Sequence, residues 1–236
     1  MDLKNIHKFE VNSEESFVSI QKSLVKKIRL INRFKEEIKL CAGIDLAYWE
    51  KGEEHYAVCC IVVINYKTKK EVEKVYSYGK INVPYVAGFL AFRELPLIVE
   101  AAKKLTLEPD IFIFDGNGYL HFNHMGIATH ASFFLNKPTI GVAKSYLKIG
   151  GVDFNMPQND EGSYNDIVIN GEVYGRVLRT RKDVKPIFIS CGNYIDLETC
   201  TKIVSELVNK ESRLPIPVRL ADLETHIMRN ELKKLI

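Results

Sequence analysis

Two aspartates of the sequence lie among apolar neighbours, where a carboxylate is costly unless it is paired or bound to a metal ion. Asp115 directly follows the apolar run 111–114, and Asp45 lies within the largely apolar stretch 41–48. Because neighbouring strands of a sheet lie about 4.8 Å apart, the two carboxylates could share one divalent ion if both stretches are strands. The alternative for Asp115 is a side chain that only caps the turn formed by residues 116–118.

The stretches around these aspartates have the patterns of strands. Residues 111–114 form a short, unbroken apolar run closed by turn residues, which predicts a central strand buried on both faces. In open α/β sheets, ligands collect outside the carboxyl ends of such strands, where Asp115 would lie. An antiparallel meander is expected from residues 41–48, 56–65 and 71–82.

The rest of the chain predicts the elements that would frame these carboxylates. Helices are expected at 13–34, at 89–105 with a kink or restart at Pro96, at 125–135, at 196–209 and at 220–235. A strand at 138–143 should run parallel to the Asp115 strand through a right-handed crossover. A hairpin around Asn170-Gly171 is expected at 167–179, a loose loop at 155–165 and a strand at 187–190. No repeat or linker interrupts the chain, so we expect one domain spanning residues 1–236.

Composition and charge limit the ways in which the chain could bind nucleic acid. The chain has 236 residues, 46% of them hydrophobic and 27% charged, which is ordinary for a protein with a substantial core. Its formal net charge is only +3, so any nucleic-acid binding must come from local basic patches. Two patches are candidates, and each is either a solvated surface or a contact for a phosphate backbone. They are the predicted helix face with Lys22, Lys26, Lys27, Arg29 and Arg33, and the cluster of Arg179, Arg181, Lys182 and Lys185.

The cysteines and the first residues favour a cytoplasmic protein. The five cysteines are odd in number and form no CxxC pair, so we expect reduced core thiols. The first residues lack the apolar core of a signal peptide, and no run reaches the length of a membrane span. His121, His124 and His130 fit no zinc pattern, and we expect them to contact phosphate or to pack within loops.

Five stretches carry a recognisable pattern when they are taken together. They are Gly43-Ile-Asp45, the run PYVAGFLAFRE at 84–94, Phe114-Asp-Gly-Asn-Gly118, Pro138-Thr-Ile-Gly-Val-Ala-Lys144 and Arg219-Leu-Ala-Asp222. In this order, over roughly residues 40 to 230, the chain resembles the endonuclease V family of deoxyinosine 3′-endonucleases. The resemblance implies an RNase H-like α/β fold, a mixed sheet with three antiparallel strands first and parallel strands next, flanked by helices. The elements predicted above follow the same order.

The resemblance implies roles for specific side chains. Asp45, Glu94 and Asp115 match the family's acidic triad, which binds Mg²⁺ or Mn²⁺. Asp222 matches a fourth position on the last helix, occupied by Asp or His among relatives. Hard oxygen ligands suit these ions, which can activate a water and stabilise the leaving 3′-oxygen. Lys144 matches a lysine near the scissile phosphate, although by itself it could be a surface lysine at a strand end.

The resemblance also implies a recognition loop and a base pocket. The wedge loop that enters a duplex beside the lesion is matched by Pro84, Tyr85, Val86 and Ala87, the last in place of the usual Pro. The pocket for the flipped hypoxanthine base is matched by Gly88, Leu90, Gly116 and Gly126. An aromatic ring at Tyr85 could fill the gap left by the base, and the alternative is a turn aromatic packed on the core.

One segment departs from the family pattern. Many relatives have His-Pro-Arg after the Asp-Gly-x-Gly turn, whereas this chain has His121-Phe122-Asn123. His121 keeps its place among the substrate-binding residues, but the Arg and its phosphate contact are lost. His124 and Arg176 are the candidates to replace it.

We therefore expect a Mg²⁺-dependent endonuclease acting on inosine in DNA or RNA. It would hydrolyse the phosphodiester bond on the 3′ side of the lesion and leave 3′-hydroxyl and 5′-phosphate ends. We expect a monomer that binds no membrane. Two other functions stay open. One is another RNase H-like phosphodiesterase of the resolvase type, against which the wedge loop argues. The other is a catalytically silent binder of inosine-containing nucleic acid, against which the intact acidic residues argue.

Overall fold

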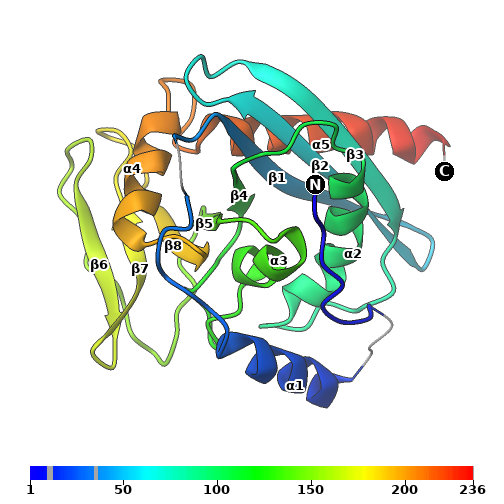
Figure 1. Ribbon diagram of the computed structural model, residues 1–236, viewed down its shortest axis with the longest axis horizontal. Coiled ribbons are helices and arrows are strands. Elements are labelled where there is room, and N and C mark those ends of the chain that lie inside the picture. Colours follow the sequence, from blue (N-terminus) through cyan, green and yellow to red (C-terminus); the bar gives the residue numbers. More distant parts are fainter. Residues whose placement is uncertain (10–12, 35–36, 236) are drawn as a thin grey trace.

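The computed structural model describes residues 1–9, 13–34 and 37–235, and within them eight strands form one mixed sheet flanked by five helices (Figure 1). The strands are β1 (Leu40–Lys51), β2 (Glu54–Asn65), β3 (Glu71–Lys80), β4 (Ile111–Asp115), β5 (Thr139–Ala143), β6 (Tyr164–Ile169), β7 (Glu172–Leu178) and β8 (Ile187–Asn193). The helices are α1 (Glu14–Val25), α2 (Leu90–Lys103), α3 (Ile127–Leu135), α4 (Leu197–Leu207) and α5 (Ile216–Leu235). The order across the sheet is β3-β2-β1-β4-β5-β8-β7-β6.

The strand pairing confirms the predicted fold class. β1, β2 and β3 pair antiparallel, whereas β4 pairs parallel with β1 and β5 parallel with β4. This is the RNase H-like arrangement. Beyond β5 the sheet continues through β8, β7 and β6, and all of these pairings are antiparallel. Asn170 and Gly171 form the predicted hairpin turn between β6 and β7, with φ angles of 52° and 81°.

Two helices, α1 and α5, differ from their predicted extents, and α5 begins at Ile216 rather than at residue 220. α1 ends at Val25, so the expectation of a helix up to residue 34 is wrong in its second half. Beyond Val25 the chain is bonded to the end of β8 instead, since Arg29 N donates to Asn193 Oδ1 at 2.7 Å. Ile31, an apolar residue of the predicted helix, is 67% exposed. The predicted basic helix face is therefore not continuous. α2 runs without a restart through Pro96.

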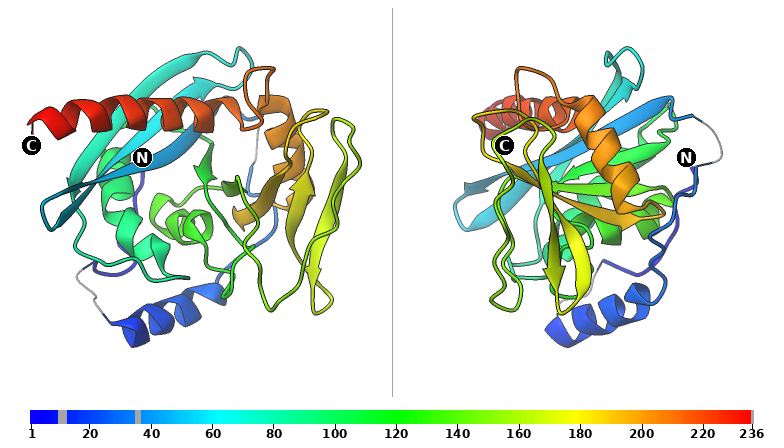
Figure 2. Two further views of the ribbon diagram at one scale, coloured as in Figure 1. Left: turned by 180° about the vertical axis from the view of Figure 1, so that it is seen from behind. Right: turned by 90° about the vertical axis from the view of Figure 1, so that its left-hand side faces the viewer.

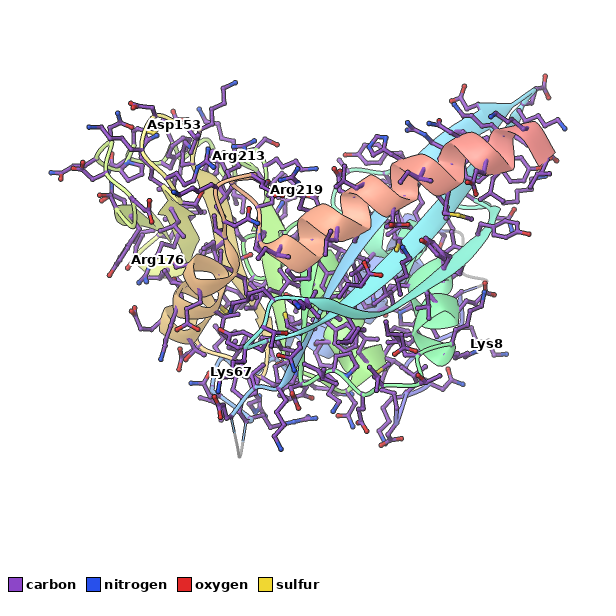
Figure 3. All side chains as sticks on the ribbon, turned by 90° about the horizontal axis from the view of Figure 1, so that it is seen from above. Lys8, Lys67, Asp153, Arg176, Arg213 and Arg219 are labelled. Atoms are coloured by element: carbon purple, nitrogen blue, oxygen red, sulfur yellow. The ribbon has the colours of Figure 1, made fainter. Side chains whose placement is uncertain are left out.

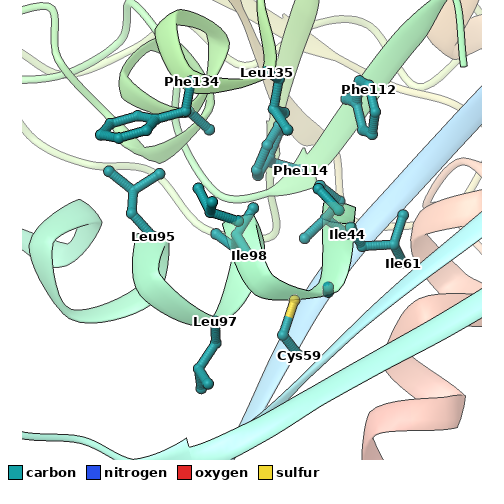
Figure 4. Close-up of a cluster of buried hydrophobic side chains, with 14 of the residues drawn as sticks. Ile44, Cys59, Ile61, Leu95, Leu97, Ile98, Phe112, Phe114, Phe134 and Leu135 are labelled. Atoms are coloured by element: carbon teal, nitrogen blue, oxygen red, sulfur yellow. The ribbon is translucent and has the colours of Figure 1, made fainter. Parts of the chain in front are cut away.

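The helices cover both faces of the sheet. α2 and α3 pack on one face, over a core that includes Ile44, Ile98 and Phe114 (Figure 4). α4 and α5 pack on the other face, where α5 lies along β1 and β2 (Figure 2). All five cysteines are buried and free, as expected of core thiols. Among the described residues, no helix combines the length and apolar character needed to cross a bilayer.

Candidate active site

Asp45 and Asp115 lie side by side on two adjacent parallel strands, Asp45 in the middle of β1 and Asp115 at the carboxyl end of β4. The register pairs Ile44 of β1 with Phe114 of β4, so the two aspartates occupy the next position on each strand. Ile44 and Phe114 face the core under α2 and α3. Because side chains alternate along a strand, the two carboxylates point to the opposite face, which α5 covers.

A close crossing of α5 over β1 brings a third carboxylate to the pair. Gly43 allows this crossing, since a Cβ at that position would lie 2.1 Å from the carbonyl carbon of Pro217. Farther along α5, Thr225 Oγ1 donates to Asp45 Oδ2 at 3.0 Å. Asp222 lies one turn before Thr225 on the same helix face. As a result, carboxylate oxygens of Asp45, Asp115 and Asp222 all lie within 4.8 Å of one another.

Glu94 approaches the site from the opposite face of the sheet. It lies in the first half of α2, is 7% exposed, and accepts a hydrogen bond from the hydroxyl group of Tyr48. Burial, with a smaller contribution from the charges of Asp45 and Asp115, raises its pKa to about 7. Among the described residues, the close cluster consists of the three aspartates and leaves Glu94 outside, next to them. Asp222 thus joins the two strand aspartates in the close cluster, and the implied role of Glu94 as a metal ligand stays a prediction.

The electrostatics of the cluster suit a bound cation. Burial, together with the neighbouring Asp115, raises the pKa of Asp45 to about 7, and burial raises the pKa of Asp115 as well. Lys144 Nζ lies 2.6 Å from Asp115 Oδ2 and 3.0 Å from Asp222 Oδ1. Burial disfavours the Lys144 ammonium, but its bonds to both carboxylates outweigh this effect and raise its pKa. A single ammonium among three carboxylates leaves negative charge, and hard oxygen donors fit Mg²⁺ or Mn²⁺.

Three side chains that support the site, Tyr48, Thr225 and Arg213, were not predicted from the sequence. Tyr48 donates to Glu94, and Thr225 donates to Asp45. Each lies three residues after a candidate carboxylate, Tyr48 after Asp45 and Thr225 after Asp222. Because this spacing brings side chains together on a helix, it could have indicated only Thr225. Arg213 bridges carbonyl groups, donating to Pro186 O at 2.7 Å and to Lys144 O at 3.1 Å. Figure 3 places Arg213 near the start of α5. No local pattern marks Arg213, because both of its partners are distant in sequence.

The predicted wedge loop lies on the surface before α2. Tyr85 is 70% exposed, which contradicts the alternative of a turn aromatic packed on the core. Gly88 has a φ of +86°, and its carbonyl accepts a hydrogen bond from Gln21 Nε2 at 3.0 Å. Leu90 is the first residue of α2 and is half-buried.

The predicted pocket glycines lie in a crowded crossing after β4. A Cβ on Gly116 would lie 2.7 Å from Ile127 Cγ2, and one on Gly126 would lie 2.3 Å from Asn117 O. Gly116 also lines a surface pocket of about 350 Å³ that includes Asp115, Lys144 and Tyr146. The turn between β4 and α3 therefore packs directly beside the carboxylate cluster.

The histidines predicted near this turn occupy different environments. His121 is buried, which lowers its pKa to about 4. His124 stacks on Tyr119 with a centroid distance of 4.0 Å and lies 3.8 Å from Glu172 Oε2. His130 is fully buried, and its Nε2 lies 2.8 Å from Nε2 of His7.

Several predicted basic contacts are engaged within the protein. Arg176 binds Asp166 at 2.8 Å and Glu198 at 3.0 Å, beside α4 in Figure 3, so it cannot replace the missing arginine without breaking both ion pairs. Arg179 donates to Gln158 O at 2.8 Å and to Val184 O, and Arg181 donates to Lys210 O. Of the four cations of the 179–185 cluster, Lys182 and Lys185 are exposed.

Comparison with known proteins places the chain. The sequence model of the family described as endonuclease V matches residues 22–223. Endonuclease V of Clostridium acetobutylicum is 72% identical over 98% of this chain and 100% of its own. The crystal structure of endonuclease V from Bacillus subtilis has a TM-score of 0.96 at 61% identity and covers 100% of both chains. Endonuclease V of Ciona intestinalis, in complex with a 24mer DNA containing an inosine, has a TM-score of 0.81 at 32% identity, covering 94% of this chain and 98% of that chain. The chain belongs to the endonuclease V family.

Proposed function

We propose that this protein is a metal-dependent endonuclease that recognises inosine in nucleic acid and hydrolyses the phosphodiester bond on the 3′ side of the lesion. The products would carry 3′-hydroxyl and 5′-phosphate ends. The observation that carries the proposal is the cluster of Asp45, Asp115 and Asp222 with Lys144 bonded between two of its carboxylates. The complex of the Ciona relative with inosine-containing DNA supports the choice of substrate.

Four carboxylates would provide the ligands for the cation. Asp45, Asp115 and Asp222 would hold Mg²⁺ or Mn²⁺, with Glu94 contributing from the α2 side. The bound ion would supply the positive charge that lowers the pKa of a water and stabilises the leaving oxygen. The Lys144 ammonium, 41% exposed and held beside these carboxylates, is placed to bind the scissile phosphate.

Recognition would use the loop before α2. Extruding a base from a duplex costs a few kcal/mol, and the cost is smaller for a weakly paired base such as inosine. The exposed Tyr85 ring would fill the gap, with Pro84, Val86 and Ala87 shaping the wedge around it. The base pocket would be lined by Gly88, Leu90, Gly116 and Gly126, with His121 beside it.

We further propose that the chain works as a cytoplasmic, monomeric single domain of residues 1–236 in the repair of deaminated DNA or in the processing of RNA.

A cleavage assay tests the proposal. Oligonucleotides with one inosine, or with adenosine at the same position, would be incubated with the protein in Mg²⁺, in Mn²⁺ and in chelator. We expect one cut on the 3′ side of inosine that needs the cation. Glu94→Ala should abolish the cut, whereas Glu100→Ala, an exposed acid on the same helix, should not. Cleavage of branched DNA without inosine preference would indicate a resolvase, and inosine binding without cleavage would indicate a silent binder.

A further inference from the structure

Phe122 is an aromatic residue that the proposed mechanism leaves unused. It lies where many relatives have Pro, on the segment that follows the Asp115 turn, and 47% of it is exposed. Single exposed apolar residues are ordinary on protein surfaces, so exposure alone says little. The contacts around Phe122 must therefore show whether the ring is placed for a ligand.

A buried amide joins this segment to the wedge loop. Gln21 of α1 is 1% exposed, and its Nε2 donates to Gly88 O at 3.0 Å. Its Oε1 accepts a hydrogen bond from Asn123 Nδ2 at 2.8 Å. Asn123 stands where the family pattern has Arg, so the departure from that pattern provides the donor that completes the bridge. Both loops are thus held to one helix by a satisfied buried amide, which is costly to leave unpaired.

The bridge sets Phe122 against the edge of the proposed base pocket. A Cβ on Gly88 would lie 3.7 Å from Phe122 Cδ2 and 3.9 Å from His121 Cε1. The rings of His121 and Phe122 stand nearly perpendicular, at 69° with a centroid distance of 5.7 Å. His121 is buried and fixed, and its Nδ1 accepts from Asn123 N at 3.3 Å. The Phe122 ring is therefore supported from behind by His121 while about half of it faces solvent.

We propose that Phe122 stacks on the extruded base at the rim of the pocket, and that the Gln21–Asn123 bridge positions it there. This inference rests on the proposed function, because it assumes that a base enters beside Gly88. An aromatic face is a sequence-tolerant platform for a nucleobase. In this division of roles, Tyr85 fills the gap that the extruded base leaves in the duplex, whereas Phe122 contacts the extruded base itself.

The contact predicts a characteristic pattern of binding losses. Phe122→Ala should weaken binding to inosine oligonucleotides in Ca²⁺ by roughly 5- to 150-fold, the range expected for one stacked base. The loss should be equal in duplex and in single strand, because an extruded base is unpaired in both. Phe122→Leu should lose most of the same affinity, while Phe122→Tyr should keep it. Tyr78→Ala removes a comparably exposed aromatic of edge strand β3, 52% exposed, and should bind as wild type.

Asn123→Ala tests the positioning role, and circular dichroism would check its fold because the change leaves the buried Gln21 Oε1 without its donor. It should weaken binding in the wild-type background but add little in the Phe122→Ala background, since Asn123 would act through the ring. Additive losses would overturn the positioning role. Full affinity in Phe122→Leu, or a Phe122→Ala loss confined to duplex, would overturn stacking on the extruded base. If wild type shows no preference for inosine, the proposed function fails. If it prefers inosine and Phe122→Ala binds equally well, only this inference fails.

Discussion

Asp45 and Glu94 are carboxyl groups whose burial raises their pKa to about 7. Asp45 accepts a hydrogen bond from Thr225, and Glu94 accepts one from Tyr48, yet these bonds only partly offset the loss of water. Strongly raised pKa values of neighbouring acids are characteristic of functional sites. Without a cation, the carboxyl groups of Asp45 and Glu94 therefore bind protons near neutral pH.

The raised pKa values predict how a cation stabilises the fold at different pH. Between about pH 4 and pH 7 the folded chain binds more protons than the unfolded chain, so these two groups make stability fall as pH rises through this window. Bound Mg²⁺ or Mn²⁺ would replace those protons. We expect the cation to raise the melting temperature more at about pH 8 than at about pH 5.5. An equal shift at both pH values would contradict a cation site at these carboxylates. Asp45→Asn should lose most of the shift.

Removing one aspartate should separate chemistry from folding. Asp45→Ala or Asp115→Ala should reduce cleavage by more than about 100-fold, since even partners of metal ligands cost 10- to 100-fold. The fold should survive, because each change removes one of several crowded negative charges. Circular dichroism would check the fold, single-turnover kinetics the cleavage, and Ca²⁺-supported binding the recognition. Near wild-type turnover in either variant would remove that carboxylate from the mechanism.

How much of this site the sequence could reveal differs from residue to residue. Asp45 and Asp115 could be predicted as neighbours because Asp45 lies within a largely apolar strand stretch and Asp115 follows an apolar run, and the register confirms it. The contact of Asp222 with them depends on the crossing at Gly43, which no local pattern encodes. Asp222 was supplied by the family resemblance, and the role that the resemblance gives Glu94 as a metal ligand stays a prediction.

At the scale of elements, the loop before α2 is held at both ends and free between them. Arg93 Nη1 donates to Val83 O at 3.1 Å, and Gln21 holds Gly88 O. Tyr85 between these anchors is 70% exposed. An aromatic ring presented from a fixed loop loses little additional entropy when it binds.

Tyr85→Ala should therefore affect recognition more than chemistry. Loss of one stacking contact, about 1–3 kcal/mol, would weaken binding roughly 5- to 150-fold. The penalty should be largest on inosine in duplex DNA, where the ring offsets unstacking, and smaller on single strands. Single-turnover cleavage and binding of both substrates would be compared with wild type. An equal loss on both would indicate a general stacking contact, and no loss on either would remove Tyr85 from recognition.

Elements with strong local signals could be predicted, whereas ends set by tertiary contacts could not. The hairpin at Asn170-Gly171 and the central strand before Asp115 have unambiguous turn residues and apolar runs. α1 was predicted too long because apolar spacing continues beyond Val25. The bonds of Arg29 to Asn193 and Tyr194, distant in sequence, take the chain away from the helix.

At the scale of the whole molecule, several arginines form ion pairs or hydrogen bonds within the protein. Arg176 bonds to two carboxylates, while Arg179, Arg181 and Arg213 bond to backbone carbonyls. The net charge is only +3. These arginines are therefore engaged within the protein, and we expect phosphate binding to depend on a modest number of exposed lysines together with the site itself.

This distribution predicts a modest salt dependence that two lysines should control. A protein that neutralises about five phosphates gives a slope near −4 to −5 for the logarithm of the binding constant against the logarithm of salt concentration on duplex DNA. Lys182→Glu combined with Lys185→Glu should flatten that slope, since both lysines are exposed and lie beside arginines that are already engaged. Lys67→Glu provides a matched charge reversal on an exposed turn, which Figure 3 places on the other side of the molecule from Arg213 and Arg219. It should leave the slope unchanged. If the lysine pair also leaves the slope unchanged, the cluster is a solvated turn, and other basic side chains, such as Lys22, Lys26 and Lys27 around the end of α1 or Lys144, must contact the phosphates.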